Sequence, residues 1–370
     1  HAVLRNLGGA VSPEHEIPKL LWLKRHRPDT WRNLRAAFDL TDFLTFKASG
    51  SPARSVCTVA CKWARGAHGW NSDFLTAIGL GDLVDHSTTP PSFPIIGDLV
   101  VPPGTPVGRL TPDAALDLFG VSLAPGAPAP VVAAGLIDAH AGALAAFGGG
   151  LERGGEAVGG EEFAAENRLV MICGTSTCHL AATREPVFVP GVWGPFYDAV
   201  TPGMWLTEGG QSATGSLIEH IIKSHPARRE LEELCAAEST SVHEWLTKRY
   251  LELRAASGPL PFDDPSAHVH VLPYFHGNRA PRADPSLRGV VSGSSLDAST
   301  DSLAVLYAST LQALVYGAVH ILQTMNNAGH DLRLIVLTGG GMAQNPVFCE
   351  ALADASGCVV AATREREASV

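Results

Sequence analysis

Residues 169–177 read LVMICGTST, and residues 332–341 read LRLIVLTGGG. Each stretch is a run of large apolar residues that stops at threonine and glycine, the pattern of a buried strand that ends in a tight turn. Helical patterns lie between the two stretches, among them residues 227–255 and 301–329. Short buried strands that alternate with helices predict an α/β fold.

The two expected turns, residues 174–177 and 338–341, place small residues where the strands end. Backbone N–H groups in such turns can approach a phosphate closely, and threonine hydroxyls add donors. A glycine that adopts a positive φ angle explains either turn taken alone. Two such turns in one domain favour a nucleotide site. The chain has neither a Walker A sequence nor G-x-G-x-x-G after a strand, so the P-loop and dinucleotide-binding patterns are missing.

The composition narrows the class of protein. The chain has 370 residues, which suits two domains, with 45% hydrophobic and 17% charged residues. Its net charge of −10 argues against a broad nucleic-acid-binding surface. The odd number of cysteines, seven, argues against a secreted disulfide framework and favours a reduced, cytoplasmic protein. We see no signal peptide and no membrane-spanning run, although residues 131–150 are strongly apolar.

A segment rich in glycine and glutamate, residues 148–162, is typical of a linker. We therefore expect a first domain at 1–150, a linker at 151–167 and a second domain at 168–370. Further elements follow from local patterns. We expect helices within 12–50 and from Thr111, at 208–223 and at 346–357, strands within 51–63, at 131–136 and at 269–274, and a loop with short strands at 87–111.

Asp138 follows the apolar run 131–136 and precedes a helical pattern, in GLIDAHAG (135–142). A carboxylate at the end of a buried strand is costly unless it is paired, solvated in a cleft or bound to a metal. Asp is also a good helix N-cap. Spacing alone leaves the cap and the catalytic interpretation equally open.

Two other polar features have ordinary explanations. His268 and His270 share one face of a strand and could ligate zinc, but neither a cysteine nor a carboxylate lies nearby at ligand spacing. A half-exposed strand face explains them better, and a zinc hydrolase is the weaker hypothesis. Lys62, in CKW, would ordinarily be a surface lysine. Glu208, in EGGQS, could belong to the capped start of a helix or to a polar loop that contacts a hydroxylated ligand.

Eight motifs occur in a fixed order along nearly the whole chain. They are GGAVSPEHEIPKLLWLK (8–24), FDLTDFLTFKASG (38–50), CKW (61–63), GLIDAHAG (135–142), ICGTSTCHL (172–180), EGGQSATG (208–215), GNRAPRADPSLRG (277–289) and LTGGGMAQNP (337–346). In combination they resemble the FGGY family of carbohydrate kinases, in particular its ribulokinase-like branch of D-ribulokinase type. The resemblance implies two actin-like, ribonuclease-H-like ATPase domains with a cleft between them.

The resemblance also implies roles for single residues. Asp138 would be the general base and would touch Mg²⁺, and Lys62, Asp138 and Glu208 would contact the sugar. Gly174, Thr175 and Ser176 would hold the ATP phosphates. The adenosine would lie against Gly340, Gly341, Gln344 and Asn345. Of these, the residue patterns by themselves indicate the two turns and Asp138, but neither Lys62 nor Glu208.

The expected activity is ATP- and Mg²⁺-dependent phosphorylation of a sugar hydroxyl, with a ketopentose such as D-ribulose as substrate. The expected partners are a small sugar and ATP, without nucleic acid or membrane, and a homodimer is allowed. The family begins with an Asp-x-Gly-Thr phosphate motif, which this sequence does not contain ahead of its first motif. We therefore expect the first domain to be incomplete and this chain alone to have little kinase activity. The alternative is a non-catalytic actin-like protein that binds a nucleotide or a sugar.

Overall fold

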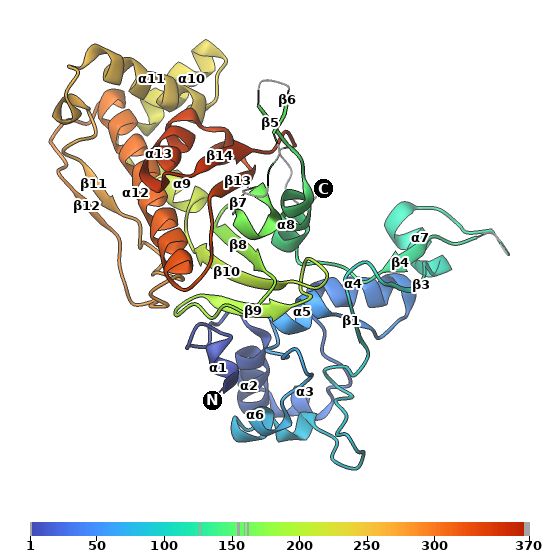
Figure 1. Ribbon diagram of the computed structural model, residues 1–370. Helices are drawn as coiled ribbons and strands as arrows, with labels where there is room; N and C mark the ends of the chain where they lie inside the picture. Colours follow the sequence, from blue (N-terminus) through green and yellow to red (C-terminus); the bar gives the residue numbers. More distant parts are fainter. Residues whose placement is uncertain are drawn as a thin grey trace. The chain divides into compact units, whose positions relative to one another are not determined.

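The computed structural model describes residues 2–124, 126, 128–153, 156–158, 160 and 163–365 (Figure 1). Its α/β class is the one that the sequence predicts. The chain divides into two compact units: residues 1–144 with 182–207, and residues 145–181 with 208–370. The expected division at 150 and 168 stays a prediction, and part of the expected linker lies outside the described residues.

The second unit is built on a sheet whose strands lie in the order β14 (Val359–Ala362), β13 (Leu334–Gly339), β7 (Arg168–Cys173), β8 (Thr177–Thr183) and β10 (Trp205–Gln211). β13 runs parallel to both β14 and β7, whereas β8 is antiparallel to β7. Every residue of β13 is buried. Burial on both faces explains the continuous apolar run, and both strands expected from it are confirmed.

Helices cover this sheet, as Figure 1 shows for α12 and α13. The helices of the unit are α9 (Gly215–Ser224), α10 (Arg228–Glu238), α11 (Val242–Ala256), α12 (Thr300–Asn327) and α13 (Pro346–Ser356). Short elements complete it: β5 (Leu151–Arg153), β6 (Glu156–Val158), β11 (His270–Leu272), β12 (Val290–Ser292), and the 3₁₀ helices η3 (Ala165–Asn167), η4 (Pro261–Asp263) and η5 (Gly341–Gln344).

Local sequence signals set the helix starts in this unit. Ser299 caps α12 by accepting a hydrogen bond from the Ser302 backbone, and Ser241 forms a capping box with Glu244 at the start of α11. Among the described residues, α12 is the one helix long and apolar enough to span a membrane, but 67% of its most apolar window is buried in the protein. Such burial is typical of the central helix of a folded core.

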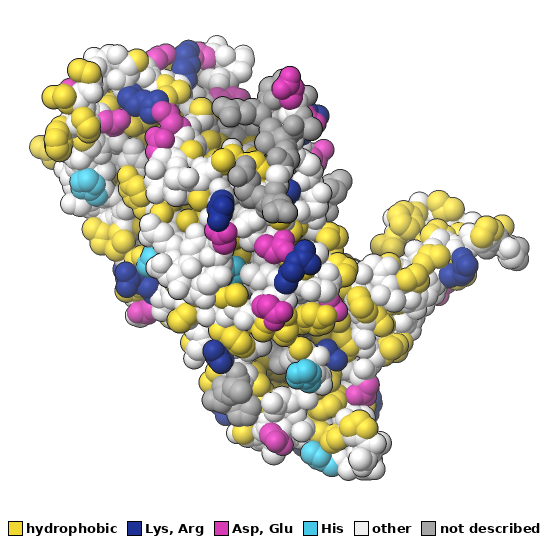
Figure 2. All heavy atoms as spheres, viewed as in Figure 1, with side chains coloured by type: hydrophobic (Ala, Val, Ile, Leu, Met, Phe, Trp, Pro, Cys, Tyr) yellow, Lys and Arg dark blue, Asp and Glu magenta, His cyan; other side chains and the backbone are white. Residues whose placement is uncertain are grey.

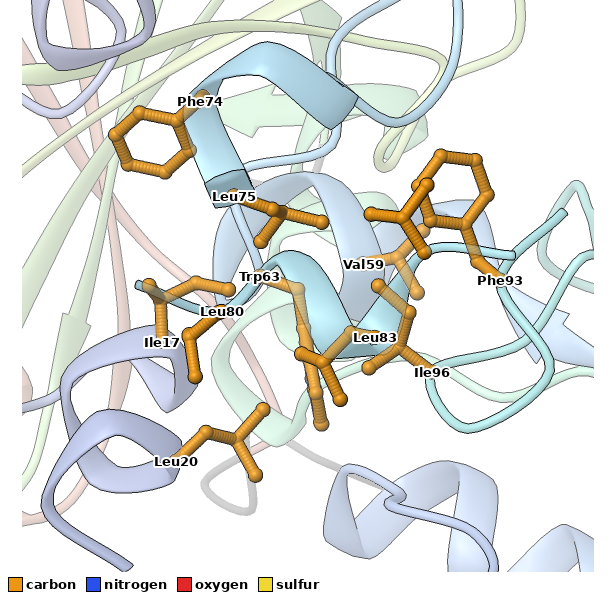
Figure 3. Packing of buried hydrophobic residues seen from close by; sticks show 11 residues of the cluster. Ile17, Leu20, Val59, Trp63, Phe74, Leu75, Leu80, Leu83, Phe93 and Ile96 are labelled. Carbon is orange, nitrogen blue, oxygen red and sulfur yellow. The ribbon is translucent and has the colours of Figure 1, made fainter. Parts of the chain in front are cut away.

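The first unit is mainly helical. Its elements are α1 (Ala2–Arg5), α2 (Glu16–His26), α3 (Pro28–Arg32), α4 (Leu40–Ser49), β1 (Arg54–Ser55), α5 (Val56–Cys61), α6 (Ser72–Ala77), η1 (Gly81–Leu83), β2 (Val100–Val101), β3 (Pro106–Arg109), α7 (Pro112–Phe119), β4 (Val131–Ala133) and β9 (Trp193–Tyr197). α8 (Asp138–Gly148) begins in this unit. Figure 3 shows its core, where Trp63 and Val59 of the α5 segment meet Leu83 and Ile96.

Three expected elements are wrong in part. Residues 51–63 form only a two-residue strand before α5, because Ser55 accepts a hydrogen bond from the Cys57 backbone and starts a helix. Residues 208–211 belong to β10, and the helix starts only at Gly215. The strand within 131–136 ends at Ala133 and is not buried, since Val131 is 57% exposed.

One apolar surface of the first unit faces solvent. α7 buries only its small residues Ala114 and Ala115, while Leu116, Leu118 and Phe119 are 56–66% exposed. Figure 2 shows apolar side chains gathered on the part of the chain that α7 occupies in Figure 1. A contiguous exposed patch of this kind is typical of an interaction surface.

Candidate functional site

The two glycine-rich turns of the second unit come together at one edge of its sheet. β7 and β13 are paired in parallel, and the register sets Gly339 opposite Cys173 at their carboxyl ends. The Gly340 N–H donates to the Cys173 carbonyl oxygen at 2.9 Å. Gly339 has φ +105°, and a β-carbon there would collide with that same carbonyl group, so the turn requires glycine.

The start of α9 holds the turn after β7. The N–H of Gly215 and the hydroxyl of Thr214 both donate to the Gly174 carbonyl oxygen at 3.1 Å. The Ser216 hydroxyl donates to the Thr175 carbonyl oxygen at 3.1 Å. A β-carbon at Gly215 would lie 2.7 Å from the Gly174 oxygen, so only glycine allows this approach. The positive end of the α9 dipole therefore lies beside the 174–176 turn.

Both turns line a single cavity of about 620 Å³. Its wall is formed by the strand ends, one side of α9 from its first to its last turn, and residues of α11 and α12. The lining residues are Cys173, Gly174, Thr175, Gly215, Ser216, Ile218, Glu219, His220, Lys223, His243, Tyr307, Leu311, Gly340, Gly341 and Met342. The volume lies in the range of small-molecule and cofactor sites.

One wall of the cavity carries charge. Glu219 lies between two basic groups, with its carboxylate 3.0 Å from the Lys223 ammonium and 3.1 Å from the His243 ring. The hydrogen bond from Lys223, and then that from His243, holds the pKa of Glu219 below its usual range. The wall therefore offers an ionised carboxylate next to an ammonium group, both within reach of a polar ligand.

The expected adenosine residues differ in their positions. Gly340 and Gly341 line the cavity. The Gln344 amide instead donates to the Thr363 carbonyl oxygen at 3.1 Å. Asn345 is buried: its amide donates to the Thr247 hydroxyl at 2.8 Å and to the Tyr307 hydroxyl at 3.0 Å. Asn345 thus supports Tyr307, which itself lines the cavity.

Ser176 belongs to the same turn as Gly174 and Thr175 but is not part of the cavity wall. Its carbonyl oxygen accepts the Gly174 N–H at 2.9 Å, which closes the turn. The cavity residues that sequence reasoning missed, including Glu219, Lys223 and His243, come from helices. Their only sequence signal is the polar face of an amphipathic helix, which is common to most surface helices.

The two sugar-site candidates of the first unit, Asp138 and Lys62, lie close to α8 and α5. Asp138 is exposed in the first turn of α8, and its Oδ1 accepts the neighbouring Ala139 N–H at 2.7 Å. Lys62 follows α5 and is half-buried, with its ammonium 5.6 Å from the centre of the Trp193 ring. α5 and α8 are linked by the buried Cys57 Sγ and His140 Nδ1, 3.1 Å apart.

The third sugar-site candidate, Glu208, lies in β10 of the second unit and is 3% exposed. Its Oε1 is 2.5 Å from Nη2 of Arg279, so the two form a buried ion pair. Arg279 belongs to GNRAPRADPSLRG, which contributed to the family resemblance but received no role of its own from sequence reasoning.

The sequence suggested two metal sites, zinc at His268 and His270 and Mg²⁺ at Asp138. In the described part of the chain, no group of three or more His, Cys, Asp and Glu side chains could hold an ion. The strand that carries His270 therefore lacks the further ligands that a zinc site needs. Mg²⁺ is different, because it keeps several waters and is usually bound through one or two carboxylates and substrate phosphates. A single exposed carboxylate such as Asp138 fits an ion that arrives with ATP.

Sequence and structure comparisons identify the family. The family model described as "FGGY family of carbohydrate kinases, C-terminal domain" matches residues 169–370, more than half of the chain. The chain belongs to the FGGY family of carbohydrate kinases. The cavity described above lies in the part that this FGGY domain covers.

Other proteins match over nearly the whole chain. An FGGY carbohydrate kinase domain-containing protein of Xenopus laevis is 45% identical over 99% of this chain and 64% of its own length. A D-ribulokinase of Saccharomyces cerevisiae is 34% identical over 99% of this chain and 52% of its own length. The solved xylulose kinase of Rhodospirillum rubrum shares the fold, with a TM-score of 0.68, 20% identity, and coverage of 99% of this chain and 64% of that one. The chain thus spans less than two thirds of the length of these relatives.

Proposed function

We propose that the full-length protein transfers the γ-phosphate of ATP to a hydroxyl of a ketopentose such as D-ribulose. Membership of the FGGY family supports a sugar kinase. The names of two similar proteins, the yeast D-ribulokinase and the xylulose kinase of Rhodospirillum rubrum, favour a pentulose. The observation that carries the proposal is that both glycine-rich strand ends open into one cavity large enough for a nucleotide.

The cavity suggests how ATP would lie. The phosphates would approach Gly174, Thr175 and Ser176, where the positive end of α9 favours negative charge. The adenosine would lie toward Gly340 and Gly341, with Gln344 and Asn345 behind them. Mg²⁺ bound to the phosphates would neutralise part of their charge and would be touched by Asp138.

The sugar would be held by Lys62, Asp138 and Glu208. Asp138 would accept the proton of the attacking hydroxyl as that oxygen bonds to the γ-phosphorus. The bond between the γ-phosphorus and the bridging oxygen breaks, and ADP leaves with the electron pair. Most of the catalytic effect in phosphoryl transfer comes from positioning and charge stabilisation, and a general base adds about 10²–10⁴-fold.

The direct test is to measure ADP formation by the full-length protein with a panel of ketopentoses and polyols. We expect ADP formation that depends on one or a few ketopentoses, and above all on D-ribulose. If ATP binds but no sugar stimulates ADP release, the non-catalytic alternative replaces this proposal.

Location and assembly belong to the same proposal. All seven cysteines are free thiols, which fits a reducing compartment such as the cytoplasm.

Analytical ultracentrifugation of the purified protein tests for the homodimer, for which the measured molar mass would be twice that of the protomer.

A further inference from the structure

The buried pair of Glu208 and Arg279 joins β10 to the segment 277–285. Their side chains are 3% and 8% exposed, and the guanidinium lies 2.5 Å from the carboxylate. Removing two charges from water costs several kcal/mol per ion, so a buried pair is weak evidence for stability, and apolar residues of similar size often serve the fold as well. A pair at this position therefore calls for a reason other than stability.

The strand is shaped to accept the guanidinium. A β-carbon at Gly210 would lie 3.0 Å from the central carbon of the Arg279 guanidinium and 3.1 Å from its Nε. The guanidinium therefore packs directly on the backbone of β10, two residues after Glu208. A side chain at residue 210 would push Arg279 away from the carboxylate.

Hydrogen bonds within residues 278–284 fix the segment that carries Arg279. Asn278 and Asp284 exchange backbone hydrogen bonds of 2.9 Å in both directions. The side chain of Asn278 also accepts the Arg282 N–H at 3.0 Å. The backbone at Arg279 is therefore fixed, and this limits the positions that its long side chain can adopt.

The imidazole of His179, which feels the charge of Arg279, carries no charge of its own at pH 7. His179, in β8, is fully buried, and this burial lowers its pKa to about 3. A backbone hydrogen bond at Thr177 opposes the shift, and the charge of Arg279 adds to it. His179 is thus neutral at pH 7, whereas the Arg279 guanidinium that contacts Glu208 is charged.

We propose that Arg279 is a positioning residue of the sugar site, which keeps the buried Glu208 ionised and fixed so that its carboxylate can accept a hydrogen bond from a sugar hydroxyl. Without a counter-charge, burial favours the neutral carboxylic acid. The acid is a weaker acceptor and rotates more freely. This inference rests on the proposed function, because Glu208 contacts a sugar only if the protein binds one.

The first experiment measures the ionisation of Glu208 without any sugar. Infrared spectra at pH 7 are compared for the wild type, Arg279→Met and the double variant Glu208→Gln/Arg279→Met. We expect a protonated-carboxyl band in Arg279→Met that is missing from the wild type and from the double variant. Arg279→Gln gives the same measurement if the Met variant does not fold. Lack of the band in both single variants overturns the inference.

The second experiment measures ligand affinity in the same proteins. We expect Arg279→Met to raise the KM for the ketopentose at least about tenfold, as when one partner of a buried charged pair is removed, with the KM for ATP unchanged. Arg279→Lys should restore most of the affinity and abolish the band. The control is Arg249→Met, which breaks a half-buried ion pair with Asp301 (2.6 Å) and should change neither KM.

The two experiments separate this inference from the proposed function. If the band appears as expected but the wild type binds no ketopentose, the pentulose assignment fails while the effect of Arg279 on Glu208 stands. If the wild type phosphorylates a ketopentose and Arg279→Met leaves its KM unchanged, the inference fails and the proposed function stands.

Discussion

The backbone N–H of Gly340 donates a hydrogen bond of 2.9 Å to the carbonyl oxygen of Cys173. This bond joins the ends of two parallel strands that lie more than 160 residues apart in the sequence. It brings the 174–176 turn and the 339–341 turn to one cavity. The nucleotide site that we propose depends on this junction.

Substitution of Gly340 tests the adenosine end of the cavity. Gly340 has a φ of −66°, and a β-carbon there would lie 3.8 Å from the nearest atom, so a side chain is compatible with the backbone. Gly340→Val should fold but fill the cavity, and should weaken ATP binding about 5- to 150-fold, as an overpacking cost of about 1–3 kcal/mol predicts. Calorimetric titration measures this, and sugar binding should not change.

A matched control is Gly148→Val at the exposed end of α8, where a β-carbon meets open space. Its ATP affinity should equal that of the wild type. Equal ATP affinities of the wild type and Gly340→Val would contradict the adenosine assignment.

Substitution of Asp138 tests the general base. Asp138 is exposed and its carboxylate bonds only a neighbouring N–H among the contacts that the structure shows, so Asp138→Asn should leave the fold intact. We expect kcat to fall by about a hundredfold or more, while both substrates still bind. Asp113→Asn, in the first turn of α7, makes the same chemical change at another helix start and should keep full activity. Near-wild-type turnover of Asp138→Asn would eliminate Asp138 as the base.

Acid should destabilise the protein through His330. This side chain is buried and has no hydrogen-bond partner among the described residues, and burial lowers its pKa from 6.5 to about 4. Between these values the unfolded chain takes up a proton and the folded chain does not, so stability is present above pH 6.5 and is lost as the pH falls toward 4. The loss should be about 3 kcal/mol.

Denaturant unfolding at pH 7 and pH 4 measures that loss. His330→Leu should lose less stability than the wild type on going to pH 4, by about the amount given above. His268→Leu removes an exposed histidine instead and should behave like the wild type. A pH dependence that is the same in His330→Leu and the wild type would rule out His330 as the cause.

The sequence predicted the sheet core because its pattern is simple. The apolar runs of β7 and β13 are buried on both faces, so they read as strands without knowledge of the tertiary structure. The helix α12 has a regular apolar period and a Ser299 cap. The same signals failed at 51–63, where cysteine and valine suggest a strand but the Ser55 cap and the core around Trp63 select a helix.

Much of the site could not be predicted from local sequence. The side chains of Glu219 and His243 reach the cavity from helices whose positions depend on packing. Glu208 was expected only through the family resemblance, and nothing in the pattern EGGQ indicates a buried charge. Its partner Arg279 lies 71 residues further along, and only the folded chain brings the two charges together.

The central claim is phosphate transfer to a ketopentose, and following the phosphorus measures it most directly. The full-length protein is incubated with MgATP and D-ribulose, and ³¹P NMR records the products. We predict a new phosphomonoester signal that grows in step with ADP and that grows about a hundredfold more slowly, or slower still, in Asp138→Asn. Signals of ADP and inorganic phosphate alone, or unchanged ATP despite ATP binding, would contradict the claim that this protein is a pentulose kinase.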